Sequence, residues 1–150
     1  MAFLEIKDYI YINSDNLVSI YLDEKVSNNG EINLIFKSVN YDMKCEDNVI
    51  NCSEQLGKKI IAKLKPQISS EFIAIGENLI IKKDFISIIF ANSDEKIRVS
   101  TRNGETLDSY ISDENGKLDA IANEIKGASS FFGIGWKRGD YNEQQWLFQN

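Results

Sequence analysis

Residues 72–90, FIAIGENLIIKKDFISIIF, match an earlier stretch of the chain, residues 3–22, FLEIKDYIYINSDNLVSIYL. In both stretches a phenylalanine opens a short apolar run, and a polar turn follows. Then come an apolar pair, an aspartate and an alternating run that contains Ser-Ile. Self-similarity of this kind is the sequence signature of a repeated structural unit. The alternative, which stays open at this point, is a coincidence of common strand patterns.

Alternation with a period of two marks the strands. Apolar side chains alternate over residues 18–22 and 86–90, which predicts a strand in each stretch. The pair Asn103-Gly104 lies between two further strand-like runs, residues 97–101 and 106–111. Because Asn-Gly supplies the positive φ angles that a type I′ turn needs, this segment predicts a β-hairpin.

Helical spacing follows the strands in both halves. The apolar positions concerned are Leu56, Ile60, Ile61 and Leu64 in the first half, and Leu118, Ile121, Ala122 and Ile125 in the second. Ser53 is placed to cap the first helix, which must end before Pro66. Gly127 is a plausible residue to follow the end of the second helix.

The sequence therefore predicts an α+β fold, a tandem repeat of three or four antiparallel strands and one helix. A half of this size buries too little apolar surface to be stable alone. We expect the halves, residues 3–64 and 72–125, to form a single domain over residues 1–127. Residues 128–150 are expected to form an aromatic- and glycine-rich C-terminal extension.

Composition excludes several chemistries. The chain has 150 residues, 23 acidic and 17 basic, a net charge of −6, and no histidine. Ser-His-Asp, Cys-His and His-ligated metal sites all need an imidazole and are therefore excluded. Neighbouring carboxylates such as Asp113 and Glu114 fall in expected loops, where they solvate turns. We therefore expect no catalytic residue and no metal site.

Glycine-rich phosphate loops are also missing from the sequence. Gly133-Ile134-Gly135 lacks the third glycine of the dinucleotide fingerprint and has no strand-helix-strand unit after it. No GxxxxGK[ST] motif occurs. The chain is therefore expected to bind no cofactor and not to be an enzyme.

Cysteine use and hydropathy bear on the compartment. Cys45 and Cys52 are seven residues apart, a spacing that fits neither a redox pair nor a zinc site, so both are expected to be free thiols in a reducing cytoplasm. Charges interrupt the longest apolar stretch, residues 79–91, and no signal peptide pattern opens the chain, so no membrane association is expected. Lysine outnumbers arginine 14 to 3, which suggests an AT-rich bacterial or phage genome.

The C-terminal segment carries both tryptophans and shows no clear period. Aromatic side chains together with arginine are typical of interface hot spots. The candidate partner-binding residues are Phe131, Phe132, Trp136, Arg138, Tyr141, Trp146 and Phe148. The alternative, that these aromatics fold back and cap the core, stays open.

The aromatic residues of the sequence favour nucleic-acid binding, whereas its net charge opposes it. Exposed aromatic side chains on a sheet can stack bases, and the candidates are Tyr9, Tyr11, Tyr21, Phe36 and Tyr41. The predicted arrangement resembles, in topology alone, the PUR and Whirly single-strand binders, whose sequence motifs are absent. Phosphate attraction needs clustered cations, whereas this chain is acidic overall, with local lysines at positions 58, 59, 63, 65, 82 and 83. These lysines are expected on the wet face of the first helix and at a hairpin edge, and nucleic acid is not expected as a partner.

The sequence thus favours a non-enzymatic, bacterial or phage, cytoplasmic binding module that acts through a protein partner or by self-association as a homo-oligomer. The alternative is a nucleic-acid-related protein. It would be either a single-strand binder with tandem strand-helix repeats or an acidic inhibitor that occupies a nucleic-acid site on another protein. A surface rich in lysine and tyrosine would favour single-strand binding, and clustered carboxylates would favour the inhibitor.

Overall fold

The computed structural model describes residues 3–7, 9–23, 30–40, 42, 44–91, 96–110, 120–121, 123–124 and 135–138. The chain divides into two compact units, Met1–Lys82 and Lys83–Asn150.

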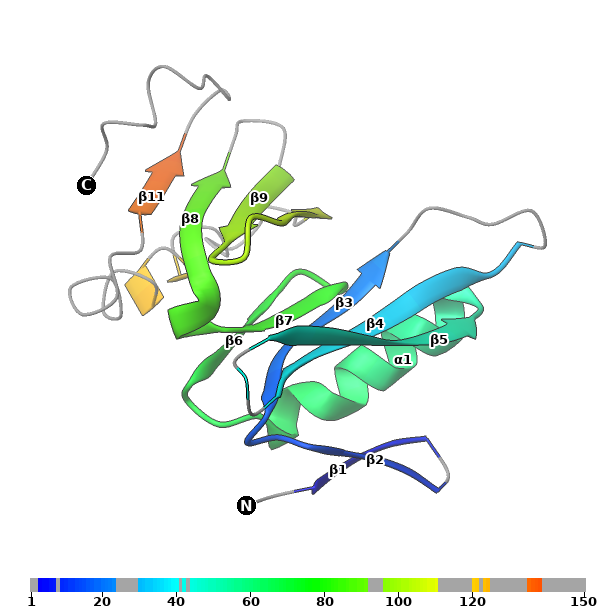
Figure 1. Ribbon diagram of the computed structural model, residues 1–150. Coiled ribbons are helices and arrows are strands. Elements are labelled where there is room, and N and C mark those ends of the chain that lie inside the picture. Colours follow the sequence, from blue (N-terminus) through cyan, green and yellow to red (C-terminus); the bar gives the residue numbers. More distant parts are fainter. Residues whose placement is uncertain are drawn as a thin grey trace. The chain divides into compact units, whose positions relative to one another are not determined.

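The first unit is built on a five-stranded antiparallel sheet in the order β5-β4-β3-β7-β6 (Figure 1). β3 (Leu17–Asp23), β4 (Ile32–Val39) and β5 (Cys45–Cys52) form a meander. β6 (Phe72–Ile75) and β7 (Leu79–Lys82) form a hairpin, and β7 pairs with the free edge of β3. Strands from separate parts of the chain therefore share one sheet.

Helix α1 (Glu54–Leu64) follows β5 directly. The Ser53 hydroxyl accepts a hydrogen bond from the Leu56 N–H at 3.1 Å, which satisfies one of the otherwise unpaired donors of the first turn. After Leu64 the chain tightens into the 3₁₀ helix η1 (Lys65–Gln67), which contains Pro66. The prediction of this helix, its cap and its end is confirmed.

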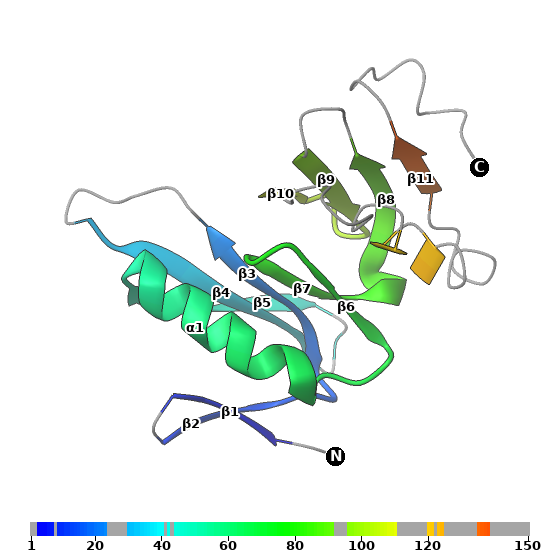
Figure 2. The same ribbon diagram turned by 180° about the vertical axis from the view of Figure 1, so that it is seen from behind.

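A separate hairpin of two strands, β1 (Phe3–Lys7) and β2 (Ile10–Asn13), opens the chain. It lies beside α1, as Figure 2 shows from behind. Tyr9 in its turn has a φ of +67°. The hairpin and α1 together cover one face of the sheet.

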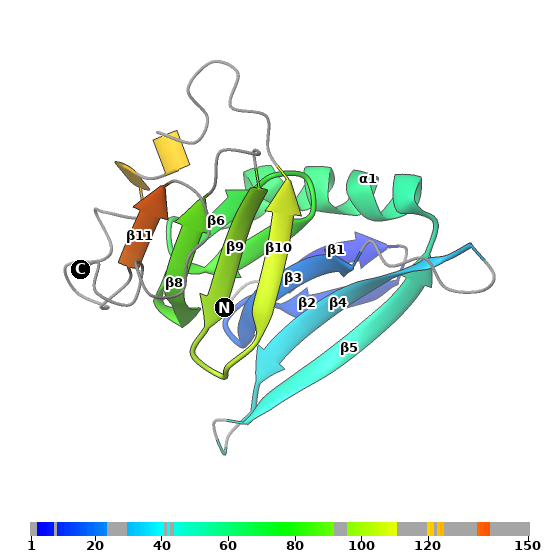
Figure 3. The same ribbon diagram turned by 90° about the horizontal axis from the view of Figure 1, so that it is seen from above.

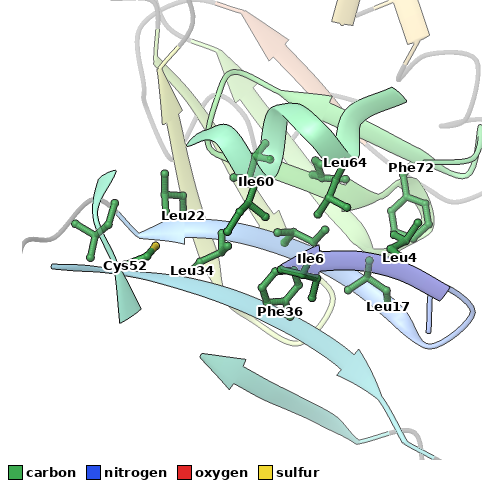
Figure 4. Close-up of a cluster of buried hydrophobic side chains, with 14 residues drawn as sticks. Leu4, Ile6, Leu17, Leu22, Leu34, Phe36, Cys52, Ile60, Leu64 and Phe72 are labelled. Atoms are coloured by element: carbon green, nitrogen blue, oxygen red, sulfur yellow. The ribbon is translucent and has the colours of Figure 1, made fainter. Parts of the chain in front are cut away.

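The core of the first unit lies between this face and its cover (Figure 4). β1 contributes Leu4 and Ile6, and α1 contributes Ile60, Ile61 and Leu64. The sheet contributes Leu17, Ile20, Leu22, Ile32, Leu34, Phe36, Cys52, Phe72 and Ile80. The β3–β4 pairing shifts register between Leu17 and Ser19, so Leu17 joins Ile20 and Leu22 in the core.

The second unit contains a four-stranded sheet in the order β10-β9-β8-β11 (Figure 3). A short 3₁₀ helix, η2 (Lys83–Phe85), leads into β8 (Ile86–Ala91). β9 (Lys96–Thr101) and β10 (Thr106–Tyr110) continue the sheet as antiparallel strands, and β11 (Gly135–Arg138) runs parallel to β8. The prediction of antiparallel β-sheet is confirmed for most of these pairs.

The predicted hairpin at Asn103-Gly104 is confirmed, but its turn type differs. The Gly104 N–H donates to the Thr101 carbonyl at 3.0 Å, and Gly104 has a φ of +86° while Asn103 does not have a positive φ. This is a type I turn followed by a glycine in the left-handed region, rather than type I′. The glycine of the Asn-Gly pair supplies the left-handed residue that this longer loop requires.

The predicted fold class is wrong, because the described residues do not show a tandem repeat of strands and a helix. The hairpin β6–β7, expected to open a second half, instead extends the sheet of the first unit. α1 is the one α-helix delimited among the described residues; of the second predicted helix, the structure describes helical backbone at residues 120–121 and 123–124. The physical reason is that the edge of β3 presents unpaired backbone groups, which β7 satisfies. The domain over residues 1–127 and the extension from residue 128 stay predictions, since residues 125–134 lie outside the described part of the chain.

Candidate nucleic-acid interface

The β1–β2 hairpin has one buried and one exposed face. Leu4, paired with Ile12, lies on the buried face, as does Ile6. Phe3 and Tyr11 lie on the opposite face, where their exposed fractions are 61% and 57%. Alternation along an antiparallel pair thus places two aromatic side chains in solvent.

The turn of this hairpin adds further exposed apolar surface. Tyr9 is 94% exposed and Ile10 is 41% exposed. Scattered apolar side chains on a surface are ordinary, but several on one small element indicate a binding surface. The hairpin is such an element.

Lysines gather on the solvent side of α1 and at its end. Because the apolar residues of α1 face the core, the side chains of Lys59 and Lys63 are exposed, and Lys58 and Lys65 are half-buried. The Lys58 ammonium lies 3.1 Å from Glu54 Oε1, a pair four residues apart on the helix. The first helix therefore has the lysine-bearing wet face that its sequence predicted.

Glu5 joins the aromatic hairpin to the lysine-bearing helix. The Tyr11 hydroxyl donates to Glu5 Oε2 at 3.1 Å, and Lys63 Nζ lies 3.5 Å from Glu5 Oε1. An exposed tyrosine and an exposed lysine therefore meet at the same glutamate. We call the surface at this contact the hairpin–helix surface and define it by Phe3, Glu5, Tyr9, Tyr11, Lys59 and Lys63.

The other residues predicted to stack on bases do not belong to the hairpin–helix surface. Tyr21 lies on the sheet face opposite α1 and is half-buried. Phe36 is 1% exposed and belongs to the core, so its prediction as a stacking residue is wrong. Alternation along β4 shows that Phe36 and its neighbours face opposite ways, but it does not show which face is covered. Tyr41 lies outside the described residues.

The sheet face opposite α1 carries a lysine whose charge is already matched. Lys37 is 5% exposed and forms an ion pair with Asp47 on the neighbouring strand. Val49, on the same face, is 53% exposed. This face is therefore mixed polar and aliphatic, and it is not the basic one.

The structure describes two of the seven residues predicted to bind a partner. Trp136 and Arg138 belong to β11, where they pair with Ile89 and Ala91 of β8. The remaining five, Phe131, Phe132, Tyr141, Trp146 and Phe148, lie outside the described residues. Their role stays a prediction. Phe3, which the sequence analysis did not single out, could have been found from its place on the same strand face as Glu5.

Neither Cys45 nor Cys52 forms a disulfide bond among the described residues. In the described ranges no three or more Cys, Asp or Glu side chains come together in a way that could hold a metal ion. Among the helices that the structure describes, none combines the length and the apolar character needed to cross a bilayer.

Comparisons with known proteins give one structural likeness. No protein-family model matches the chain, and no curated protein matches it. Among solved structures the chain is similar to the LytTr DNA-binding domain of a methyl-accepting/DNA response regulator from Bacillus cereus, with a TM-score of 0.47 and 11% sequence identity. The likeness covers 85% of this chain and 98% of that chain.

Our expectation that nucleic acid is not a partner is corrected by the surface that the structure shows along α1. It rested on a net charge of −6, which sums all 150 residues. The structure gathers lysines on one side of α1, so the summed charge does not describe the local surface.

Proposed function

We propose that this protein binds single-stranded nucleic acid on the hairpin–helix surface. The observation that carries the proposal is the Lys63–Glu5–Tyr11 connection, which brings an exposed ring and an exposed ammonium group to the same glutamate. Bases would stack on Phe3, Tyr9 and Tyr11, and the lysines of α1 would contact phosphates.

The chemistry suits an unpaired strand better than a duplex. Aromatic stacking needs bases whose faces are open, and each stacked base contributes about 1–3 kcal/mol. Phe3 and Tyr11 lie on the same face of adjacent strands and are both more than half exposed. The two rings can therefore serve neighbouring bases.

The existing ion pair leaves the lysine available. Lys63 and Glu5 are 49% and 43% exposed at the side chain. Exposed pairs of this kind contribute about 0–1 kcal/mol, so a phosphate can take the place of the carboxylate at small cost. The same glutamate lowers the net positive charge of the surface, so we expect moderate affinity and sensitivity to salt.

We thus favour a nucleic-acid-related protein, the alternative in the sequence analysis, over a module that binds a protein partner. Of its two forms we favour direct binding over an acidic inhibitor, because the surface that carries the proposal is basic and aromatic. The role is one of binding, with no catalytic residue and no cofactor assigned. We place it in a reducing cytoplasm, in keeping with Cys45 and Cys52 as cysteines outside any disulfide bond.

Fluorescence anisotropy with a labelled oligothymidylate tests the proposal. Tyr11→Ala and Tyr9→Ala should each weaken binding by about 5- to 150-fold, the loss of one stacked base. Val49→Ala is the matched control, since Val49 is also exposed on a strand but lies on the opposite side of the first unit's sheet from α1. Unchanged affinity in both tyrosine variants, or equal weakening by Val49→Ala, would contradict the assignment.

A further inference from the structure

The turn between β6 and β7 lies against α1. Lys65 Nζ donates to the Gly76 carbonyl at 2.8 Å, and Lys58 Nζ lies 3.6 Å from Glu77 Oε2. Gly76 has a φ of +64°, a conformation that glycine adopts without strain. These contacts fix one wall of a pocket beside the helix.

The pocket has a volume of about 290 Å³. It is lined by Lys58, Lys59, Ala62, Lys65 and Glu77. The small side chain of Ala62 leaves room between the long lysines. Three lysines and one glutamate thus line a space beside the helix that can hold a small anionic group.

The lysines differ in how far their charges are already matched. Lys58 is shared between Glu54 and Glu77. Lys65 donates to a neutral carbonyl, the Gly76 oxygen, which does not offset the lysine's charge. Lys59 is exposed, and no carboxylate in the described part of the chain lies within ion-pair distance of it. Lys59 and Lys65 therefore give the pocket a surplus of positive charge.

We infer that this pocket binds a phosphate monoester, the terminal phosphate of a single strand whose bases lie on the hairpin. The inference rests on the proposed function and adds the strand end to it. A terminal monoester carries a charge of about −1.5 to −2 at pH 7, whereas each internal phosphodiester carries one charge. The group with the higher charge gains more from several lysines that line one site.

The position of the pocket fits this arrangement. Lys59 lines the pocket and Lys63, one helical turn further on, belongs to the ion pair with Glu5. Four residues of α-helix advance about 6 Å, a distance that one or two nucleotides of a strand can span. A strand that starts in the pocket can follow α1 to the aromatic rings.

Two single-stranded oligothymidylates of equal length, one with and one without a 5′-phosphate, test the inference. A 3′-phosphorylated strand shows which end is bound. The full chain should bind one phosphorylated form about tenfold more tightly than the unphosphorylated strand, as one added charge-assisted contact would give. Lys59→Gln and Lys65→Gln should remove this preference. Glu77→Gln should increase it, because the variant removes the one carboxylate that lines the pocket.

Lys63→Gln is the matched control, since Lys63 lies on the same helix outside the pocket and should weaken binding of both strands equally. Equal affinity for phosphorylated and unphosphorylated strands, or a preference that survives Lys59→Gln and Lys65→Gln, would overturn the inference. Tyr11-dependent binding of the unphosphorylated strand would still support the proposed function in that case.

Competition by inorganic phosphate tests the phosphate pocket independently of single-strand binding. Phosphate alone should compete with the phosphorylated strand, and Glu77→Gln should strengthen that competition. If phosphate binds in a Lys59-dependent way while no oligonucleotide binds, the phosphate pocket is supported and the proposed function is contradicted.

Discussion

Gly57 lies where α1 packs against β3. A Cβ atom at this position would overlap Cδ1 of Leu22, which is fully buried in the core, and would approach Cys52 Sγ at 3.4 Å. The absence of a side chain therefore sets how closely the helix approaches the sheet.

Gly57→Ala should lower the free energy of unfolding by about 1 kcal/mol, because overpacking of about 1–3 kcal/mol exceeds the helix-propensity gain of about 1 kcal/mol. Urea denaturation measures the change. Combining it with Leu22→Val should cost less than the sum of the two single variants, because the valine makes room for the new methyl group. A more stable Gly57→Ala variant would mean that Leu22 moves aside freely.

Lys37 is buried, so the stability of the first unit depends on the ion pair that matches its charge. Asp47→Asn would leave its ammonium group, 6% exposed at the side chain, without the carboxylate, and should lower the free energy of unfolding by about 2 kcal/mol. The double variant Lys37→Met/Asp47→Asn should recover most of this loss, since it leaves no buried charge. Thermal or urea unfolding of the three variants decides the matter, and an Asp47→Asn protein as stable as the original would show that this pair contributes little.

At the scale of the element, α1 depends on its first turn. Ser53→Ala removes the hydroxyl that accepts from the Leu56 N–H and should cost about 1 kcal/mol of stability, whereas Ser53→Asp should cost little. Circular dichroism during urea denaturation compares them. Equal midpoints for the alanine and aspartate variants would show that the cap is not needed.

The elements also show where sequence reasoning succeeds. α1 was predicted because its signals are local: a capping serine, apolar residues at helical spacing and a terminating proline all lie within 14 residues. The strand partner of β7 could not be predicted in this way. β7 pairs with β3, about 60 residues earlier in the chain, and any exposed strand edge of suitable length would have satisfied the same local pattern.

The candidate interface was predictable in part for a related reason. Composition and spacing placed Lys59 and Lys63 on the wet side of a helix, and Tyr9 and Tyr11 among exposed aromatics. The contact that joins them, Lys63 with Glu5, spans 58 residues of sequence and depends on how the hairpin packs beside α1. Phe36 was predicted to be an exposed aromatic and is buried. Its burial depends on which face of the sheet the helix covers, and the local sequence does not show this.

At the scale of the whole molecule, the dependence of binding on salt concentration shows whether an acidic protein contacts phosphates directly. With about three lysine–phosphate contacts, the logarithm of the association constant should fall with the logarithm of salt concentration with a slope of about −2. Lys59→Gln should reduce the magnitude of that slope by about 0.7. Anisotropy titrations over a range of sodium chloride concentrations measure both slopes, and a slope near zero would rule out backbone contacts.

The central claim is that one surface, formed by the β1–β2 hairpin and the lysine side of α1, receives a single strand. The most direct test is a titration of the isotope-labelled full chain with oligothymidylate, followed through the amide resonances by nuclear magnetic resonance. We expect the shifts to concentrate at Phe3, Glu5, Tyr9, Tyr11, Lys59 and Lys63, with little change at Val49 or Asn51 on β5. Shifts centred on β5 or on the second unit, with the hairpin and α1 unaffected, would contradict it.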